Sequence, residues 1–89
     1  MTQPTSVNGK VRTIMAKVSR VDLTELEDDI RFREEMGVDS LMAMEIVATC
    51  EKRLSIVLDE TELARLETIG EFVAYVNDVF ERTHGSPQP

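Results

Sequence analysis

Hydrophobic residues recur at helical spacing in three separate stretches of the chain. Spacings such as i, i+4, i+7, i+8 and i+11 place residues on one face of an α-helix, because successive residues turn by about 100°. The three apolar faces consist of Val7, Val11, Ile14, Met15 and Val18; of Ala43, Ile46, Val47, Cys50 and Leu54; and of Ile69, Phe72, Val73, Val76 and Phe80. Three such faces predict a bundle around one core, in which Ile46, Cys50, Leu54, Phe72 and Val76 are buried together.

Polar residues mark where the predicted helices begin. Thr68 and Glu71 form a Thr-x-x-Glu capping box in front of the third long helix. Asp59, three residues before Glu62, indicates a short helix that ends at about Arg65. Strand signals are weak, because the apolar run 56–58 is too short to start a sheet. The sequence therefore predicts an all-α fold: a small four-helix bundle with three long helices and one short helix.

A long connection, residues 20–39, separates the first two long helices. It is acidic, but apolar residues recur in it at Val21, Leu23, Leu26, Ile30 and Phe32. A loop of this length in a compact domain needs anchors, so we expect these residues to pack against the bundle and the loop to be ordered, with room for one short helical turn.

The two ends of the chain lack any periodicity. They are rich in Pro, Gly, Ser, Gln and Thr, which favour irregular backbone. We therefore expect a folded domain at residues 7–82, preceded by a mobile segment at 1–6 and followed by a mobile tail at 83–89.

Charge and composition narrow the classes of partner. The chain of 89 residues has a formal net charge of −7, which argues against binding to nucleic acid or to an anionic membrane. It contains no apolar run of the roughly 20 residues that span a bilayer, and its first nine residues do not form a signal peptide. Cys50 is the only cysteine, which excludes an internal disulfide and fits a reducing compartment. We expect a cytoplasmic monomer.

The residue types present offer little support for a catalytic site or a metal site. A nucleophilic serine at Ser40 needs a base, and the only histidine, His84, lies in the predicted mobile tail. The segment 37–42 also lacks the second glycine of the Gly-x-Ser-x-Gly elbow. One histidine and one cysteine cannot supply a zinc site, and the acidic run 25–29 lacks the central glycine of a calcium loop. The sequence predicts a non-catalytic protein without a metal.

The segment "GVDSLMAMEIV", residues 37–47, combines a helix start with a second apolar face. Gly37 permits a sharp turn, and Asp39 and Ser40 are both good caps for the helix that follows. A hydroxyl at a helix N-terminus is also a favourable place for a phosphate, because free backbone N–H groups and the helix dipole stabilise negative charge there.

The second face lies about 100–200° around the helix from the core face. It consists of Leu41, Met44, Glu45, Ala48 and Lys52. Exposed apolar residues are common on proteins, but this group begins beside Ser40, and methionine suits surfaces that accept several partners. We interpret it as an interaction face.

The stretch "MGVDSLMAMEIVATCEKRLSIVL" followed by "TIGEFVAYV" resembles the acyl carrier proteins, over about residues 7–82. The resemblance includes their Gly-x-Asp-Ser-Leu attachment motif, which here spans Gly37 to Leu41 with Asp39 beside the serine. It implies that a phosphopantetheinyl transferase places 4′-phosphopantetheine from coenzyme A on Ser40. The thiol of this arm then holds an acyl chain as a thioester for a ketosynthase, an acyltransferase or another synthase enzyme.

The same resemblance implies that the second helix is the docking face. The residues at the matching positions are Asp39, Leu41, Met44, Glu45, Ala48 and Glu51. Met42 and Lys52 stand where carriers of primary fatty acid synthesis are commonly acidic, and "GVDSLM" looks like polyketide-type carriers. These features favour polyketide biosynthesis over fatty acid biosynthesis. The alternative is an unmodified helical adaptor that binds a protein partner through the second helix.

Overall fold

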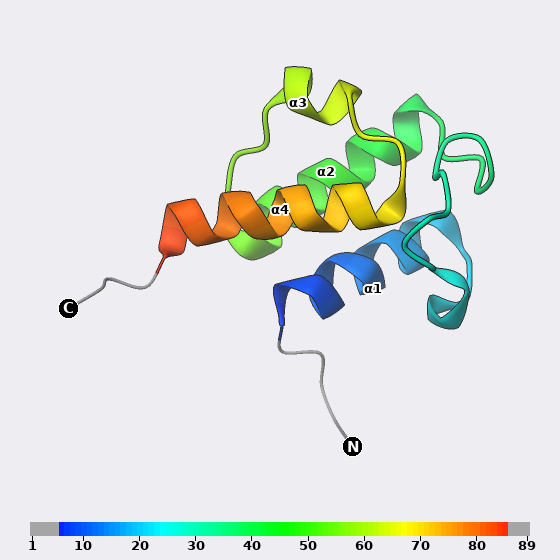
Figure 1. Ribbon diagram of the computed structural model, residues 1–89, viewed down its shortest axis with the longest axis horizontal. Coiled ribbons are helices and arrows are strands. Elements are labelled where there is room, and N and C mark those ends of the chain that lie inside the picture. Colours follow the sequence, from blue (N-terminus) through cyan, green and yellow to red (C-terminus); the bar gives the residue numbers. More distant parts are fainter. Residues whose placement is uncertain (1–5, 86–89) are drawn as a thin grey trace.

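The computed structural model describes residues 6–85 as a helical bundle, shown in Figure 1. Its elements are α1 (Val7–Ser19), the 3-10 turn η1 (Leu23–Glu25), α2 (Ser40–Leu54), α3 (Glu60–Ala64) and α4 (Ile69–His84). These residues contain no β-strand, only an isolated bridge between Arg31 and Thr68. The predicted all-α architecture, with three long helices and one short helix, is confirmed.

Side-chain caps fix the predicted helix starts. Thr68 Oγ1 accepts a hydrogen bond from the Glu71 amide at 3.1 Å, and Glu71 Oε1 accepts one from the Thr68 amide at 3.2 Å, which completes the capping box of α4. The carboxylate also accepts from the amide of Glu67 at 2.8 Å. These backbone hydrogen bonds, that of Glu67 first, lower the pKa of Glu71, because they favour its charged form. Asp59 caps α3 through the amide of Thr61 at 2.7 Å.

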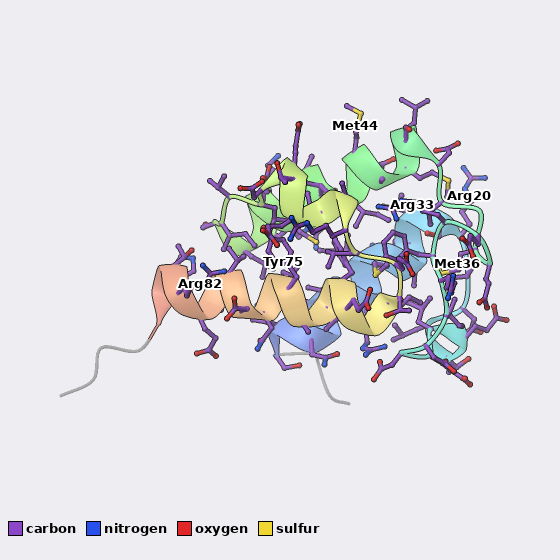
Figure 2. The ribbon with its side chains drawn as sticks, turned by 45° about the horizontal axis from the view of Figure 1, so that its top comes forward. Arg20, Arg33, Met36, Met44, Tyr75 and Arg82 are labelled. Carbon is purple, nitrogen blue, oxygen red and sulfur yellow. The ribbon has the colours of Figure 1, made fainter. Side chains whose placement is uncertain are left out.

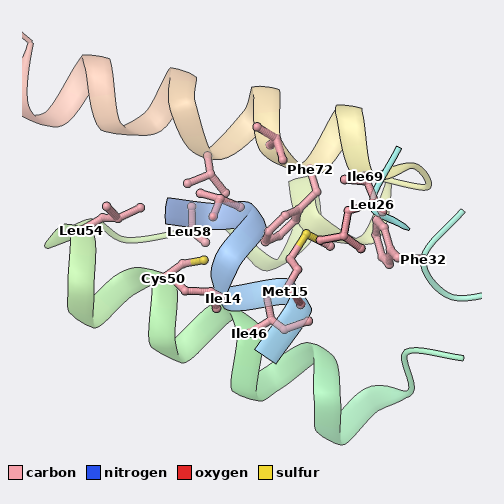
Figure 3. Packing of buried hydrophobic residues seen from close by; sticks show 14 of the residues in the cluster. Ile14, Met15, Leu26, Phe32, Ile46, Cys50, Leu54, Leu58, Ile69 and Phe72 are labelled. Carbon is pink, nitrogen blue, oxygen red and sulfur yellow. The ribbon is translucent and has the colours of Figure 1, made fainter. Parts of the chain in front are cut away.

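The core is formed where α1 packs against both α2 and α4. The five residues predicted to meet there, from α2 and α4, are all buried: Ile46, Cys50, Leu54, Phe72 and Val76. Figure 3 labels the first four of them within the core. The ring of Phe72 meets that of Phe32 edge-on, with 6.1 Å between ring centroids. Cys50 is completely buried, and this desolvation raises the pKa of its thiol to about 12. The cysteine is a core residue, as its position in the apolar stripe predicts.

The connection between α1 and α2 is ordered and anchored, as expected. Leu26 and Phe32 are buried, Val21 and Ile30 are partly buried, and the predicted helical turn is present as η1. The prediction is wrong for Leu23, which is 48% exposed because it begins η1, and this turn buries none of its residues.

Backbone hydrogen bonds join the loop to the start of α4. The amide of Phe32 donates to the Glu67 carbonyl at 3.1 Å, and the amide of Gly70 donates to the Asp28 carbonyl at 2.9 Å. A Cβ at position 70 would lie 3.0 Å from the Cβ of Asp28, so a glycine permits this close approach. The loop is thereby held against α4 directly before the turn that leads to Ser40.

The ends of the bundle differ from the predicted boundaries. Ser6 caps α1, because its hydroxyl accepts a hydrogen bond from the Gly9 amide at 3.0 Å. α4 continues through Thr83 to His84, two residues beyond the expected end at 82. The expectation that 83 and 84 belong to a mobile tail is therefore corrected, whereas the predicted mobility of 1–5 and 86–89 concerns residues outside the described part of the chain.

Candidate functional site around Ser40

Ser40 is the first residue of α2, and its side chain is exposed. The cap is Asp39, whose Oδ1 accepts a hydrogen bond from the Met42 amide at 2.9 Å. Both residues were candidate caps, and the structure assigns this role to Asp39 alone. Within residues 6–85 the Ser40 hydroxyl has no hydrogen-bond partner, so it is free to react.

A tight turn presents this hydroxyl at the surface. Gly37 adopts a left-handed conformation with φ of +73°, which residues with a Cβ rarely adopt, as the sequence predicts for this position. The next residue, Val38, is buried, and its amide donates to the Phe32 carbonyl at 3.0 Å. Ser40 therefore follows a residue that is fixed to the core.

The first turn of α2 retains free hydrogen-bond donors. The amide of Met42 is satisfied by the Asp39 carboxylate, and the amide of Ala43 by the Asp39 carbonyl at 2.8 Å. Among the described residues, the amides of Ser40 and Leu41 have no acceptor, as is usual at a helix N-terminus. These donors and the positive end of the helix dipole suit a phosphate ester on the serine oxygen.

A groove of about 740 Å³ opens beside Ser40, between α2 and α3. We call it the Ser40 groove, and it is lined by Arg33, Val38, Asp39, Ser40, Ala43, Met44, Val47, Ala48, Glu51, Glu60, Leu63 and Ala64. A small cavity of about 40 Å³ shares Ala43, Val47 and Leu63 with it and reaches core residues such as Phe72. The groove thus offers apolar walls that continue toward the core.

Arg33 is a wall residue that sequence reasoning missed. Its guanidinium donates to the Leu66 carbonyl at 2.7 Å and to the Leu63 carbonyl at 3.3 Å, and it lies 4.8 Å from the centre of the Phe32 ring. It therefore ties the long loop to the C-terminal end of α3 and is the only basic residue that lines the Ser40 groove. A contact between residues some 30 positions apart leaves no local signal in the sequence.

The six residues expected to form one docking face are divided by the structure. Asp39, Met44, Ala48 and Glu51 line the Ser40 groove. Met44 is 66% exposed and points away from the bundle in Figure 2. Glu51 is half-buried, because its Oε2 accepts a hydrogen bond from the Leu58 amide at 2.8 Å.

The other two residues of that set lie outside the Ser40 groove. Leu41 is 76% exposed on the outer side of α2. Glu45 lines a different groove, between α1 and α2. Met42, which is not part of the apolar face predicted for this helix, is half-buried and packs against the core cluster.

The structure also separates the residues that a hydrolase would need. His84 is ordered in α4, and its Nε2 lies 2.9 Å from the carbonyl oxygens of both Leu54 and Ser55. These residues are at the opposite end of α2 from Ser40, about 21 Å away along the helix axis. The histidine therefore lies far from the serine. It belongs to α4, whereas the sequence predicted that it lies in a mobile tail.

Residues 6–85 contain neither a metal-binding cluster nor a membrane-spanning helix. No group of three or more His, Cys, Asp or Glu side chains is arranged to hold a metal ion. None of the helices in this part of the chain combines the length and the apolar character needed to cross a membrane.

Comparison with known proteins identifies the family. Residues 9–76 match the family model described as "Phosphopantetheine attachment site". The polyketide-8 synthase acyl carrier protein 2 of Streptomyces avermitilis is 38% identical over 60 residues, which are 67% of this chain and 69% of that protein. The acyl carrier protein of Akkermansia muciniphila is 31% identical over 74 residues, 83% of this chain and 92% of the relative.

A third relative is far longer than this chain. The non-reducing polyketide synthase PKS1 of Zymoseptoria tritici is 39% identical over 70 residues, 79% of this chain and 3% of the synthase. The family match extends from the third residue of α1 into α4 and includes the Ser40 groove. The chain therefore belongs to the phosphopantetheine attachment family, and it is an acyl carrier protein that bears acyl intermediates on a covalently attached 4′-phosphopantetheine.

Proposed function

We propose that Ser40 is the residue to which 4′-phosphopantetheine is attached. The observation that carries this assignment is the free, exposed hydroxyl on the first residue of α2, next to two unpaired amides. Because Asp39 caps the helix, Ser40 is not needed for that purpose, and an ester on its oxygen leaves the cap intact. Gly37 and Leu41 complete the attachment motif on either side.

The attachment step requires Ser40 to act as a nucleophile toward coenzyme A. Its oxygen forms a bond to the phosphorus that carries the pantetheine, while the pyrophosphate bond to the nucleotide breaks. The serine proton passes to a base of the phosphopantetheinyl transferase, since the histidine of this chain is remote. When bound, the arm supplies the thiol that holds an acyl group as a thioester. The amides of Ser40 and Leu41 would then face the negative charge of the phosphodiester.

The surroundings of Ser40 suit a carrier better than a catalyst. The Ser40 groove offers a bound acyl chain the apolar side chains of Val47, Ala48 and Leu63. Besides Ser40, its polar residues are three carboxylates and Arg33, and Arg33 is already held by two carbonyls. We therefore propose that the chain itself catalyses no reaction and presents its acyl group to other enzymes in the cytoplasm, a compartment that the single buried cysteine fits.

We assign docking of these enzymes to the exposed side of α2. Leu41 and Met44 are large apolar side chains that the core does not use. Interfaces favour methionine and depend on a few central apolar anchors, so these two residues are the proposed anchors for the transferase, a ketosynthase and an acyltransferase. Asp39, Ala48 and Glu51 border this surface along the Ser40 groove, and Glu45 borders it toward α1.

The proposed pathway is polyketide biosynthesis. Two relatives whose names state a role in polyketide synthesis are 38% and 39% identical to this chain, compared with 31% for the acyl carrier protein of Akkermansia muciniphila. α2 also carries Lys52 and Arg53 in its last turn, so it is less acidic than the docking helix expected of a primary fatty acid carrier. A less acidic helix suits partner surfaces that are less basic.

Intact mass after incubation with a phosphopantetheinyl transferase and coenzyme A tests the assignment. The parent chain should gain the mass of one phosphopantetheine, and Ser40→Ala should gain none while keeping its circular dichroism spectrum. Ser55→Gly is the matched control, because Ser55 has φ of +55° at the other end of α2 and glycine accepts that conformation. A parent chain that stays unmodified would favour the adaptor, and modification of the alanine variant would place the arm elsewhere.

A further inference from the structure

A second groove follows α2 on its side toward α1, where it has a volume of about 550 Å³. We call it the basic groove, and it is lined by Lys10, Thr13, Ile14, Lys17, Val18, Glu45, Thr49 and Arg53. Its residues from α2 are spaced by four, so they form a stripe separate from the one that lines the Ser40 groove. The two grooves therefore lie on different sides of the same helix.

The floor of the basic groove is apolar and its rim is charged. Ile14 is buried and Val18 is half-buried, so the apolar floor between the helices is accessible mainly at Val18. The two threonine hydroxyls are already used, because Thr13 donates to the Gly9 carbonyl at 2.8 Å and Thr49 donates to the Glu45 carbonyl at 2.7 Å. The side chains left to recognise a partner are three cations and one carboxylate.

Among the described residues, the three cations have no acidic partner, despite the acidic character of the chain. The sequence contains 17 acidic residues and has a net charge of −7. Within residues 6–85, however, the ion pairs involve Arg12, Arg31 and Arg82, and none involves a cation of the basic groove. Glu45 is the only acid in the lining. The groove is thus a local concentration of available positive charge on a negative protein.

Helix stability explains two of these cations but not the third. Lys17 and Arg53 lie in the last turns of their helices, where positive charge stabilises the helix dipole. Lys10 is the fourth residue of α1, near the positive end of the dipole, and the first turn of this helix contains no acid. A cation is unfavourable at that position. Its presence therefore points to a role at the surface of the groove.

We propose that the basic groove binds an acidic, amphipathic segment of a partner protein. Carboxylates of the segment would meet Lys10, Lys17 and Arg53, and its apolar side chains would cover the floor between α1 and α2. Complementary charge of this kind speeds association and sets the register of the partner. Glu45 contributes to the register because it repels any carboxylate of the partner that is placed beside it. Because the groove lies apart from the Ser40 groove, a partner can occupy it while Ser40 and its acyl group stay accessible to a second enzyme.

The test is a titration of the full ¹⁵N-labelled chain with an amphipathic peptide of Leu, Ala and Glu, followed by amide chemical shifts. Shifts should concentrate on the residues of the basic groove and leave those of the Ser40 groove in place. A peptide with Lys at each Glu position should not bind there. The double variant Lys17→Glu, Arg53→Glu should weaken binding of the acidic peptide about tenfold or more.

Two single variants separate recognition from net charge and from folding. Arg65→Glu makes the same charge change as the single variant Lys10→Glu, but at an exposed residue outside the groove, so it should alter the dissociation constant less than about twofold. Lys10→Glu should weaken binding while its melting midpoint holds or rises, because an acid is favourable early in α1. If Lys10 served only the stability of α1, its substitution would not weaken peptide binding while the melting midpoint holds or rises.

Three results would overturn the proposal. The first is a set of shifts spread evenly over the surface, and the second is an equal loss of binding in Arg65→Glu. The third is tighter binding of the groove to inorganic phosphate or to vesicles of anionic phospholipid than to the acidic peptide. The loading of Ser40 is measured independently, by mass, and none of these three results changes it. Failure of the basic-groove proposal is therefore distinguishable from failure of the Ser40 assignment.

Discussion

Along α2, the side formed by Ile46, Cys50 and Leu54 packs into the core and is closed to solvent, whereas the side around Leu41 and Met44 is open. Ile46 is 3% exposed and Met44 is 66% exposed, although both are large apolar residues only two positions apart. Burial of such side chains stabilises a fold by about 1.5–3 kcal/mol each, so the closed side contributes stability. The open side contributes little to folding, and its apolar residues are better explained by contact with other proteins.

The largest effect on stability is expected from a substitution in the core that the closed side of α2 helps to form. Phe72→Ala removes a buried ring that contacts Phe32 at the centre of the core. We expect it to lower the free energy of unfolding by about 3–5 kcal/mol, a large share of the stability of a small domain. Urea unfolding followed by circular dichroism measures this change. An unchanged midpoint would mean that the ring is not part of the core.

An intermediate effect is expected at the junction between the two sides, where Asp39 caps α2. Asp39→Ala should cost about 1 kcal/mol of stability, because the amide of Met42 loses its acceptor. Asp39→Asn is the matched control, since asparagine is an equally good cap. If Ser40 were the true cap, Asp39→Ala would leave the stability unchanged and Ser40→Ala would lower it.

A smaller effect on stability, but a clear effect on docking, is expected on the open side. Met44→Ala and Glu45→Ala should each change the free energy of unfolding by no more than about 0.5 kcal/mol. Both should slow the transfer of phosphopantetheine to Ser40 if the transferase docks there. Added salt should reduce the contribution of Glu45 more than that of Met44, because salt screens charge and not apolar contact.

The matched control for these rates is Arg65→Ala, a truncation at an exposed residue outside α2 and both grooves. Equal rates for the parent, Met44→Ala and Glu45→Ala with every partner enzyme would show that docking takes place on another surface.

The smallest effect concerns pH and lies outside α2, in the capping box of α4. The pKa of Glu71 is lowered in the folded chain by hydrogen bonds from the Glu67 and Thr68 amides. A lowered folded pKa means that this group adds stability above its unfolded pKa and loses it as the pH falls through the folded value. Melting midpoints should therefore fall with acidification below its ordinary value of 4.5. Glu71→Gln should show a smaller acid-induced decrease than the parent.

The helices were predictable because their signals are local. Apolar spacing locates α1, α2 and α4, and the Thr68–Glu71 box and Asp59 set two helix starts within one residue. Local pattern could not choose between Asp39 and Ser40 as the cap, because both side chains suit that position. The orientation of backbone amides in the folded turn decides this question, and it is visible only in three dimensions.

The features of the site that the sequence did not predict depend on contacts between residues far apart in the sequence. Arg33 joins the wall of the Ser40 groove because it reaches Leu63 and Leu66 across the fold. Glu45 and Met44 are neighbours in sequence, yet they line different grooves, because α1 and α3 approach α2 from different sides. A helical wheel gives the angle of each residue but not which neighbour fills that direction.

The position of Cys50 has a consequence for chemical selectivity. Acyl groups on a carrier pass from one sulfur to another, and a second reactive thiol on the same chain would compete as an acceptor. Burial raises the pKa of the Cys50 thiol to about 12, so the reactive thiolate is scarce at neutral pH, and the residue is closed to solvent. The helix bundle thus acts as a protecting group in the organic chemist's sense. Before acylation, the carrier with its arm attached offers the enzymes a single reactive thiol, the one at the end of the arm.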